Sequence, residues 1–152
     1  MAERIEQEAF YRLQPIIPKS LIALGDIAEK SGMDKKLVEL VKLRASQING
    51  CAFCLNMHSR DARELGESQE RLDLVPVWRE APCFTARERA ALAWTEALTL
   101  ISRDHVPDET YAQAAAQFSR EELASLTAAI VAINGWNRIA VAFRFATVVK
   151  AA

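Results

Sequence analysis

Two cysteines and a histidine lie close together in the stretch NGCAFCLNMH, residues 49–58. Cys51 and Cys54 are three positions apart, and His58 follows four positions after Cys54. A thiolate is both a nucleophile and a metal ligand, and an imidazole can accept a thiol proton and later return it. The stretch can therefore be a redox-active thiol pair with its own proton carrier, part of a metal site, or a cluster that only fills a core.

A redox cycle of this pair follows from ordinary thiol chemistry. A free cysteine has a pKa of about 8.5, so only a few per cent is thiolate at neutral pH. A helix beginning near Cys51 would favour the anion through its unpaired N–H groups, and His58 would accept the proton. A peroxide would oxidise one cysteine to a sulfenic acid, the partner cysteine would expel water, and an external dithiol would restore both.

Two other interpretations of the cysteine pair remain open. A structural zinc ion takes four ligands, and His58, His105 and Cys83 are the residues that can join Cys51 and Cys54. Buried cysteines without any function are also common, since a free cysteine behaves as a small apolar residue. The spacing alone does not decide between these interpretations.

Helices are predicted along nearly the whole chain, because apolar residues recur at spacings of three and four and no segment keeps a period of two. The predicted fold class is all-α, a compact helical domain of about six to eight helices covering residues 1–152. After Pro15 and Pro18 a helix is expected to begin near Lys19 or Ser20.

The elements around the cysteines are predicted by a stop signal. A helix from about Asp34 to Asn49 ends there, because Gly50 can take the left-handed conformation that closes many helices. The next helix then begins near Cys51 and continues to about Leu65. At about 100° per residue, both thiols and the imidazole of the quoted stretch share the inward face of that helix. The nearest partner for the imidazole along its own helix is the second thiol.

Capping signals place the later helices. Thr85 with Glu88 forms a capping-box pattern that opens a helix continuing to about Ser102, and Pro107 is suited to start the next one. Ser119 repeats the capping pattern at the start of the last helix.

The last helix is expected to run to about Val149 and to be apolar around most of its circumference. Its length suggests a membrane span, but Asn134, Asn137, Arg138 and Arg144 would be costly in lipid, so no membrane contact is expected. Such a helix must be covered on several sides. We therefore expect part of it to be buried against another subunit of a homo-oligomer.

Composition limits the class of protein and its location. The 152 residues are 51% hydrophobic, which suits one domain with its own core. Nineteen basic residues nearly balance 20 acidic ones, so no nucleic-acid partner is expected. The first residues lack the apolar core of a secretory signal, and a cytoplasmic protein is expected. Thiols stay reduced there, which favours catalysis or metal binding over a structural disulfide.

The longer stretch ELVKLRASQINGCAFCLNMHSRDARELGE, residues 39–67, resembles the core of the alkylhydroperoxidase D-like proteins within the carboxymuconolactone decarboxylase superfamily. Their motif is a glutamate twelve positions before the first cysteine, then CxxC, three residues and a histidine. Glu39, Cys51, Cys54 and His58 match this spacing. The resemblance covers roughly residues 20–145 and implies an all-helical fold whose subunits form trimers or hexamers.

The resemblance also implies the role of each residue. Cys54 would attack the peroxide, Cys51 would resolve it as a disulfide, and His58 with Glu39 would relay the proton. The implied partners are a hydroperoxide substrate and an external dithiol reductant, with no cofactor and no metal ion. Periodicity alone instead places Glu39 on the polar side of its helix, where an exposed salt bridge is the simplest interpretation.

One position departs from the family pattern. The peroxidase that gives the family its name carries a histidine directly before the second cysteine, and this chain has Phe53 there. An apolar side chain at this position favours an organic hydroperoxide over hydrogen peroxide. Of the remaining candidates, Cys83 is expected to be structural and His105 to be a solvated loop residue.

The expected function is a thiol-dependent, alkylhydroperoxidase-like peroxidase, an oxidoreductase of the peroxiredoxin type. Two alternatives remain. The first is a cofactor-free lactone decarboxylase-like lyase on the same fold, whose chemistry does not require a dithiol. The second is a non-enzymatic redox-sensing or zinc-binding module.

Overall fold

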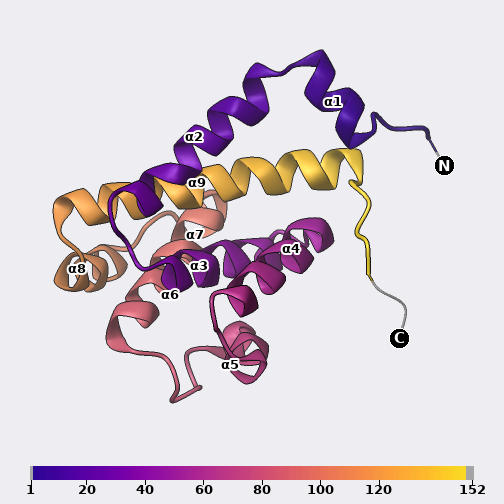
Figure 1. The fold of residues 1–152 in the computed structure, drawn as a ribbon. Coiled ribbons are helices and arrows are strands. Elements are labelled where there is room, and N and C mark those ends of the chain that lie inside the picture. The colour runs from indigo at the N-terminus through magenta and orange to yellow at the C-terminus, as the bar shows by residue number, and fades with distance from the viewer. Residues whose placement is uncertain (1, 150–152) are drawn as a thin grey trace.

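The computed structural model describes residues 2–149, so residues 1 and 150–152 of the expected domain lie outside the described residues. The described part contains nine α-helices, one short 3-10 helix and no strand (Figure 1). The all-α prediction is confirmed, with one helix more than the expected maximum. The α-helices are α1 Gln7–Leu13, α2 Ile16–Lys30, α3 Lys35–Ile48, α4 Ala52–Glu64, α5 Gln69–Leu74, α6 Ala86–Thr99, α7 Ile101–Asp104, α8 Asp108–Gln117 and α9 Arg120–Phe143. The 3-10 helix is Val75–Val77.

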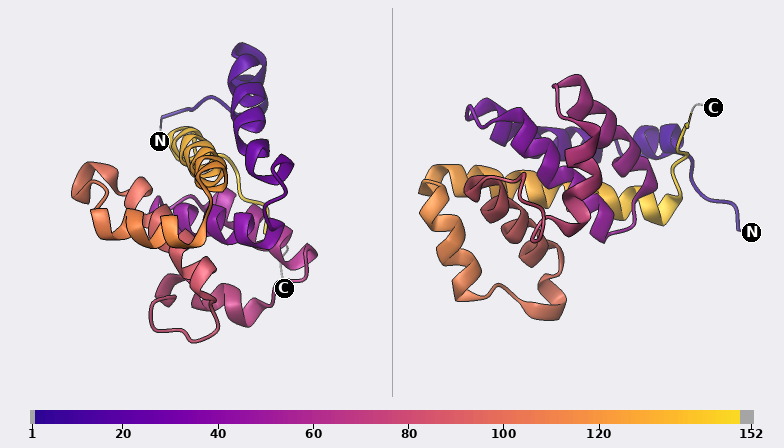
Figure 2. Two further views of the ribbon diagram at one scale, coloured as in Figure 1. Left: turned by 90° about the vertical axis from the view of Figure 1, so that its left-hand side faces the viewer. Right: turned by 90° about the horizontal axis from the view of Figure 1, so that it is seen from below.

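Helix α9 is the longest element, and α2 packs along it (Figures 1 and 2). Gly135 permits this close approach, because a Cβ atom at that position would lie 2.9 Å from Cδ2 of Leu21. Helices α3 and α6 contact α9 as well as each other. The main core therefore lies between α9 and these helices, with fully buried Val38, Ala91 and Ile130 at its centre.

Local capping signals are confirmed where they were predicted. Thr85 and Glu88 form a complete capping box at the start of α6, and Ser119 forms one with Glu122 at the start of α9. Asp34 caps α3 by accepting a hydrogen bond from the Lys36 amide. These side chains satisfy N–H groups that have no partner inside their helices.

Two predicted helix boundaries near the ends of the chain are wrong. Helix α2 begins at Ile16 and not near Lys19. Pro18 is accommodated because it lies in the first turn, where an N–H group has no intrahelical partner. Helix α9 ends at Phe143 and not near Val149, because Arg144 has a φ of 54° and the Phe145 amide donates to the Ala140 carbonyl.

The helix expected to continue to Ser102 is divided into two. Helix α6 ends at Thr99, Leu100 leaves helical geometry with a ψ of 23°, and the four-residue α7 follows. The backbone then turns at His105, which is exposed as expected and has a φ of 54°.

Among residues 2–149, α9 alone is long and apolar enough to cross a membrane by length and composition. Ala129 and Ile130 are nevertheless fully buried against the other helices of the main core. Val131 and Val141 lie on the uncovered side, 51% and 47% exposed. Helix α9 is thus a core helix with an apolar strip left open in the single chain.

Candidate active site

A tight turn between α3 and α4 positions the cysteine pair. Asn49 ends α3, and Gly50 has a φ of 65°, which a glycine adopts without strain. Cys51 is the N-cap residue of α4, and its Sγ accepts a hydrogen bond of 3.2 Å from the Cys54 amide. The thiol of Cys51 therefore lies at the positive end of the helix, where an anion is stabilised. Both cysteines are free, and they are 2% and 1% exposed.

Buried amides hold this turn against α9. The Asn49 side chain donates to Oδ1 of Asn134 at 3.0 Å and to Oδ1 of Asn137 at 2.9 Å. Asn137, fully buried, donates in turn to the Ser46 hydroxyl at 3.0 Å. These bonds join α3, the turn and α9, so the start of α4 is held in place by residues more than 80 positions away in the sequence.

Glu39 and His58 meet across the same turn. Oε2 of Glu39 lies 2.8 Å from Nδ1 of His58, and its Oε1 accepts a 2.9 Å hydrogen bond from Lys42. The structure therefore brings together the glutamate and histidine of the family motif. Glu39 is only 5% exposed, so the interpretation as an exposed salt bridge is wrong. His58 hydrogen-bonds Glu39 and not the thiol on its own helix.

The environment of Glu39 favours its ionised form. Burial raises the pKa of this carboxyl, but hydrogen bonds and charges from His58 and Lys42 outweigh burial and hold the pKa below its usual value. A carboxylate only accepts hydrogen bonds, so Nδ1 of His58 must be the donor. The other ring nitrogen, Nε2, is then left to take up a proton.

The two thiols titrate as a pair. A hydrogen bond from the Cys54 thiol lowers the pKa of Cys51 to about 7, although burial opposes the shift. The same bond, together with burial, raises the pKa of Cys54. The pair therefore loses its first proton near neutral pH and holds the second one tightly. One negative charge is shared by two sulfur atoms, and moving a single proton between them transfers that charge to Cys54.

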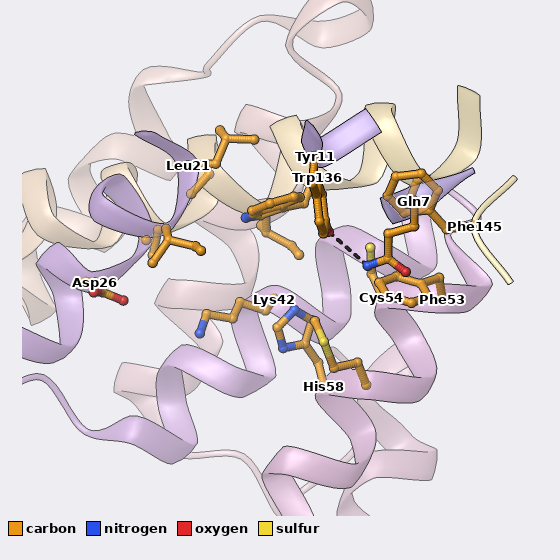
Figure 3. A pocket seen from close by; sticks show the side chains of 17 residues that line it. Gln7, Tyr11, Leu21, Asp26, Lys42, Phe53, Cys54, His58, Trp136 and Phe145 are labelled. Carbon is orange, nitrogen blue, oxygen red and sulfur yellow. Dashed lines mark hydrogen bonds between the residues drawn. The ribbon is translucent and has the colours of Figure 1, made fainter. Parts of the chain in front are cut away.

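Cys54 and His58 both line a pocket of about 310 Å³ (Figure 3). Its walls are mainly apolar and include Ile133 and Trp136 of α9 and Phe53 of α4. Cys51 is not among the lining residues, so of the two neighbouring thiols only Cys54 borders the pocket. A small organic molecule entering this space reaches Cys54 first.

Part of the pocket wall was not predicted from the sequence. Gln7 and Tyr11 of α1 line it, as does Phe145 after the end of α9. Phe145 packs edge-on against Phe53, with ring centroids 5.8 Å apart. No local motif marks these residues, because they reach the site only through packing of the chain's two end segments against α4 and α9.

The structure gives little support to a zinc site at the cysteines. Among residues 2–149, the only three potential metal ligands that come within 4.8 Å of one another are Glu39, His58 and Asp61. The Glu39 carboxylate of this group already accepts a hydrogen bond from the ammonium group of Lys42. Cys83 packs on a different core cluster from the cysteine pair.

Comparisons with known proteins show the family to which the chain is related. The sequence model of the carboxymuconolactone decarboxylase family matches residues 19–97, which include all four motif residues. The uncharacterized protein YdfG of Bacillus subtilis strain 168 is 36% identical over 142 residues, covering 93% of this chain and 95% of that protein.

Solved structures share the fold. A protein of unknown function from Agrobacterium tumefaciens, provisionally assigned as the antioxidant defence protein AhpD, is 43% identical, with a TM-score of 0.88 over 93% of this chain and 97% of that one. The debrominase Bmp8 is 22% identical, with a TM-score of 0.70 over 76% of this chain and 62% of that one. The similarity to Bmp8 extends to the fold alone.

Proposed function

The chain belongs to the carboxymuconolactone decarboxylase family as an AhpD-like member, and from this premise we propose that it is a thiol-dependent peroxidase. The observation that supports this function best is the arrangement in the wall of the pocket. Cys54 and His58 line the space, Cys51 contacts Cys54 from the start of the same helix, and Glu39 is paired with His58. The proposed reaction oxidises the two thiols to a disulfide and reduces a hydroperoxide to an alcohol and water.

The first step forms a sulfenic acid on Cys54. One proton leaves the thiol pair, with Nε2 of His58 as the acceptor and Glu39 stabilising the resulting imidazolium. A proton shift within the pair puts the negative charge on Cys54, whose sulfur attacks the outer oxygen of the hydroperoxide. The O–O bond breaks, and the inner oxygen leaves with the electron pair and becomes an alcohol once protonated.

The second step closes the disulfide. Cys51 releases its thiol proton to solvent, and its sulfur attacks the sulfur of the Cys54 sulfenic acid. The hydroxide that leaves takes from His58 the proton accepted in the first step and becomes water. The two cysteines are one helical turn apart at the start of α4, so the bond forms within a single segment. An external dithiol then exchanges with the disulfide and restores both thiols.

The pocket favours an organic hydroperoxide over hydrogen peroxide. Aromatic and aliphatic side chains line most of it, and Phe53 lies next to the attacking cysteine. Burying the apolar part of an organic substrate against these walls contributes binding free energy that hydrogen peroxide cannot gain.

We also propose a homo-oligomer, trimeric or hexameric as in related proteins. The apolar strip of α9 with Val131 and Val141 is open in the single chain, and a second subunit would cover it. Sedimentation at micromolar concentration should show an oligomer. A monomer under these conditions would contradict this assembly and leave the peroxidase proposal intact.

Thiol counting tests the peroxidase function directly. Reduced Cys83→Ser protein retains only Cys51 and Cys54, so one equivalent of cumene hydroperoxide should remove both thiols and form one equivalent of cumyl alcohol. Dithiothreitol should then restore both thiols. Alcohol formation without thiol loss, or intact thiols after excess hydroperoxide, would refute the function.

A further inference from the structure

Tyr11 lines the pocket, and its hydroxyl accepts a hydrogen bond but, within the described part of the chain, donates none. Nε2 of Gln7, one turn earlier on α1, donates to the Tyr11 hydroxyl oxygen at 2.9 Å. This bond occupies an oxygen lone pair, so the O–H hydrogen can be donated elsewhere. In residues 2–149 the structure gives that hydrogen no acceptor. Figure 3 shows the hydroxyl and the Gln7 amide directed to the part of the pocket that contains Cys54.

Packing fixes the direction of this hydroxyl. The Tyr11 ring lies edge-on to Trp136, with centroids 6.2 Å apart, and edge-on to Phe145 at 6.1 Å. Helix α1 is itself anchored by Phe10, which is buried against Phe143 and Phe145. A tyrosine held between two rings and oriented by an amide presents its hydrogen at a defined position without an ordering cost during the reaction.

The other charged or basic groups that line the pocket are engaged or unsuitable as donors. Lys42 is bound to Glu39 at 2.9 Å and to Glu29 at 3.5 Å. His58 donates its Nδ1 hydrogen to Glu39, and the proton that its other nitrogen accepts from the thiols is used by the hydroxide that leaves in the second step. Asp26 also lines the pocket, and as a carboxylate it only accepts hydrogen bonds.

We propose that Tyr11, oriented by Gln7, is a catalytic residue that donates its proton to the oxygen leaving the hydroperoxide; this inference rests on the proposed peroxidase function. As Cys54 sulfur bonds to the outer oxygen, the O–O bond breaks and the inner oxygen becomes an alkoxide. The phenol is a much stronger acid than an aliphatic alcohol, so its proton transfers to the alkoxide to give the alcohol. The tyrosinate then regains a proton from water.

A leaving-group comparison tests this role. Cumene hydroperoxide releases an alkoxide, which needs a proton donor, whereas peracetic acid releases acetate, which does not. The measured quantity is the second-order rate constant for oxidation of pre-reduced protein, followed by stopped-flow loss of thiols. Tyr11→Phe should lower this constant about tenfold or more with cumene hydroperoxide and by less than about threefold with peracetic acid.

Two further variants complete the experiment. Tyr111→Phe removes the chain's other tyrosine hydroxyl, which is outside the pocket, and should react like wild type with both oxidants. Gln7→Glu replaces the donor to Tyr11 with an acceptor that takes up the phenol hydrogen. This variant should also have a lower rate constant with cumene hydroperoxide and a nearly unchanged one with peracetic acid, even if Tyr11→Phe folds poorly.

The outcomes separate the two proposals. Unchanged rate constants in Tyr11→Phe, or equal decreases with both oxidants, would overturn the role of Tyr11 while leaving the peroxidase function in place. Wild-type protein whose thiols resist both oxidants would refute the peroxidase function and this inference with it.

Discussion

The carboxylate of Glu39 lies 2.8 Å from Nδ1 of His58, and the two residues come from adjacent helices on either side of the Asn49–Gly50 turn. Both are buried, and Lys42 balances the charge of the carboxylate. The relationship fixes which ring nitrogen carries a hydrogen and which one is left to receive a proton. In the proposed reaction, this second nitrogen receives the proton that leaves the thiols.

Glu39→Gln should slow thiol oxidation by hydroperoxide on the order of tenfold or more, because a neutral amide no longer stabilises the imidazolium form of His58. Stopped-flow thiol loss measures the effect. Glu29→Gln is the matched control, since Glu29 also contacts Lys42 but is not a partner of His58. Equal rates in both variants would contradict a proton relay through Glu39.

Replacing each cysteine should give different products. Cys54→Ser should lose rapid reaction with hydroperoxide, because neither remaining thiol, Cys51 or Cys83, lines the pocket. Cys51→Ser should react once and stop at a sulfenic acid on Cys54, which dimedone labels and mass spectrometry locates. A dimedone adduct on Cys51 in the Cys54→Ser protein, formed at the wild-type rate, would reverse the assignment of attacking and resolving thiol.

The rate of thiol oxidation should rise with pH and reach half its maximum near pH 7. The shared hydrogen bond lowers the pKa of Cys51 to about 7, so the pair carries its reactive charge above that pH and loses it below. Cys51→Ser removes the shared charge, and its pH profile should move upward toward the ordinary thiol value of about 8.5. Identical profiles for the two proteins would show that the thiols do not titrate as a pair.

Phe53→His should reduce the preference for organic hydroperoxides. The substitution replaces an apolar wall beside Cys54 with a polar ring. The ratio of rate constants for cumene hydroperoxide and hydrogen peroxide should be above one in wild type and fall severalfold in the variant. Phe84→Leu, in the core cluster on which Cys83 packs, serves as a control for a general loss of packing and should leave this ratio unchanged.

Asn137→Ala should lower the free energy of unfolding by about 2–3 kcal/mol, because Asn49 and Ser46 lose a buried hydrogen-bond partner. Urea denaturation measures the change. Asn56→Ala removes an exposed amide from α4 and should cost less than about 1 kcal/mol. Since Asn137 also helps to lower the pKa of Cys51, the variant's thiols should titrate at higher pH than those of wild type.

The sequence was sufficient for features that depend on near neighbours. The capping boxes at Thr85 and Ser119 and the turn at Gly50 involve groups within a few positions, and the structure has all three. The end of α9 was not predictable in this way. Residues 144–149 are apolar enough to continue a helix, but Phe145 instead packs against Phe10 on α1.

Glu39 shows why periodicity alone is misleading at this site. A charged residue on the polar side of a helix is ordinarily exposed, yet here a second charge and a histidine compensate for its burial. Only the twelve-position spacing to Cys51 identified it. The contributions of Gln7 and Tyr11 had no comparable signal, since they depend on how α1 packs near the pocket.

The matched family segment, residues 19–97, contains the thiols and their proton carriers, whereas Tyr11, Trp136 and Phe145 lie outside it. Part of the pocket wall is therefore encoded outside the stretch that carries the two thiols. Substitutions at Trp136 and Phe145 would change the shape of the pocket beside Cys54 while leaving the residues of the Asn49–Gly50 turn in place. This separation gives evolution, or a protein engineer, a way to change the substrate while the reaction stays the same.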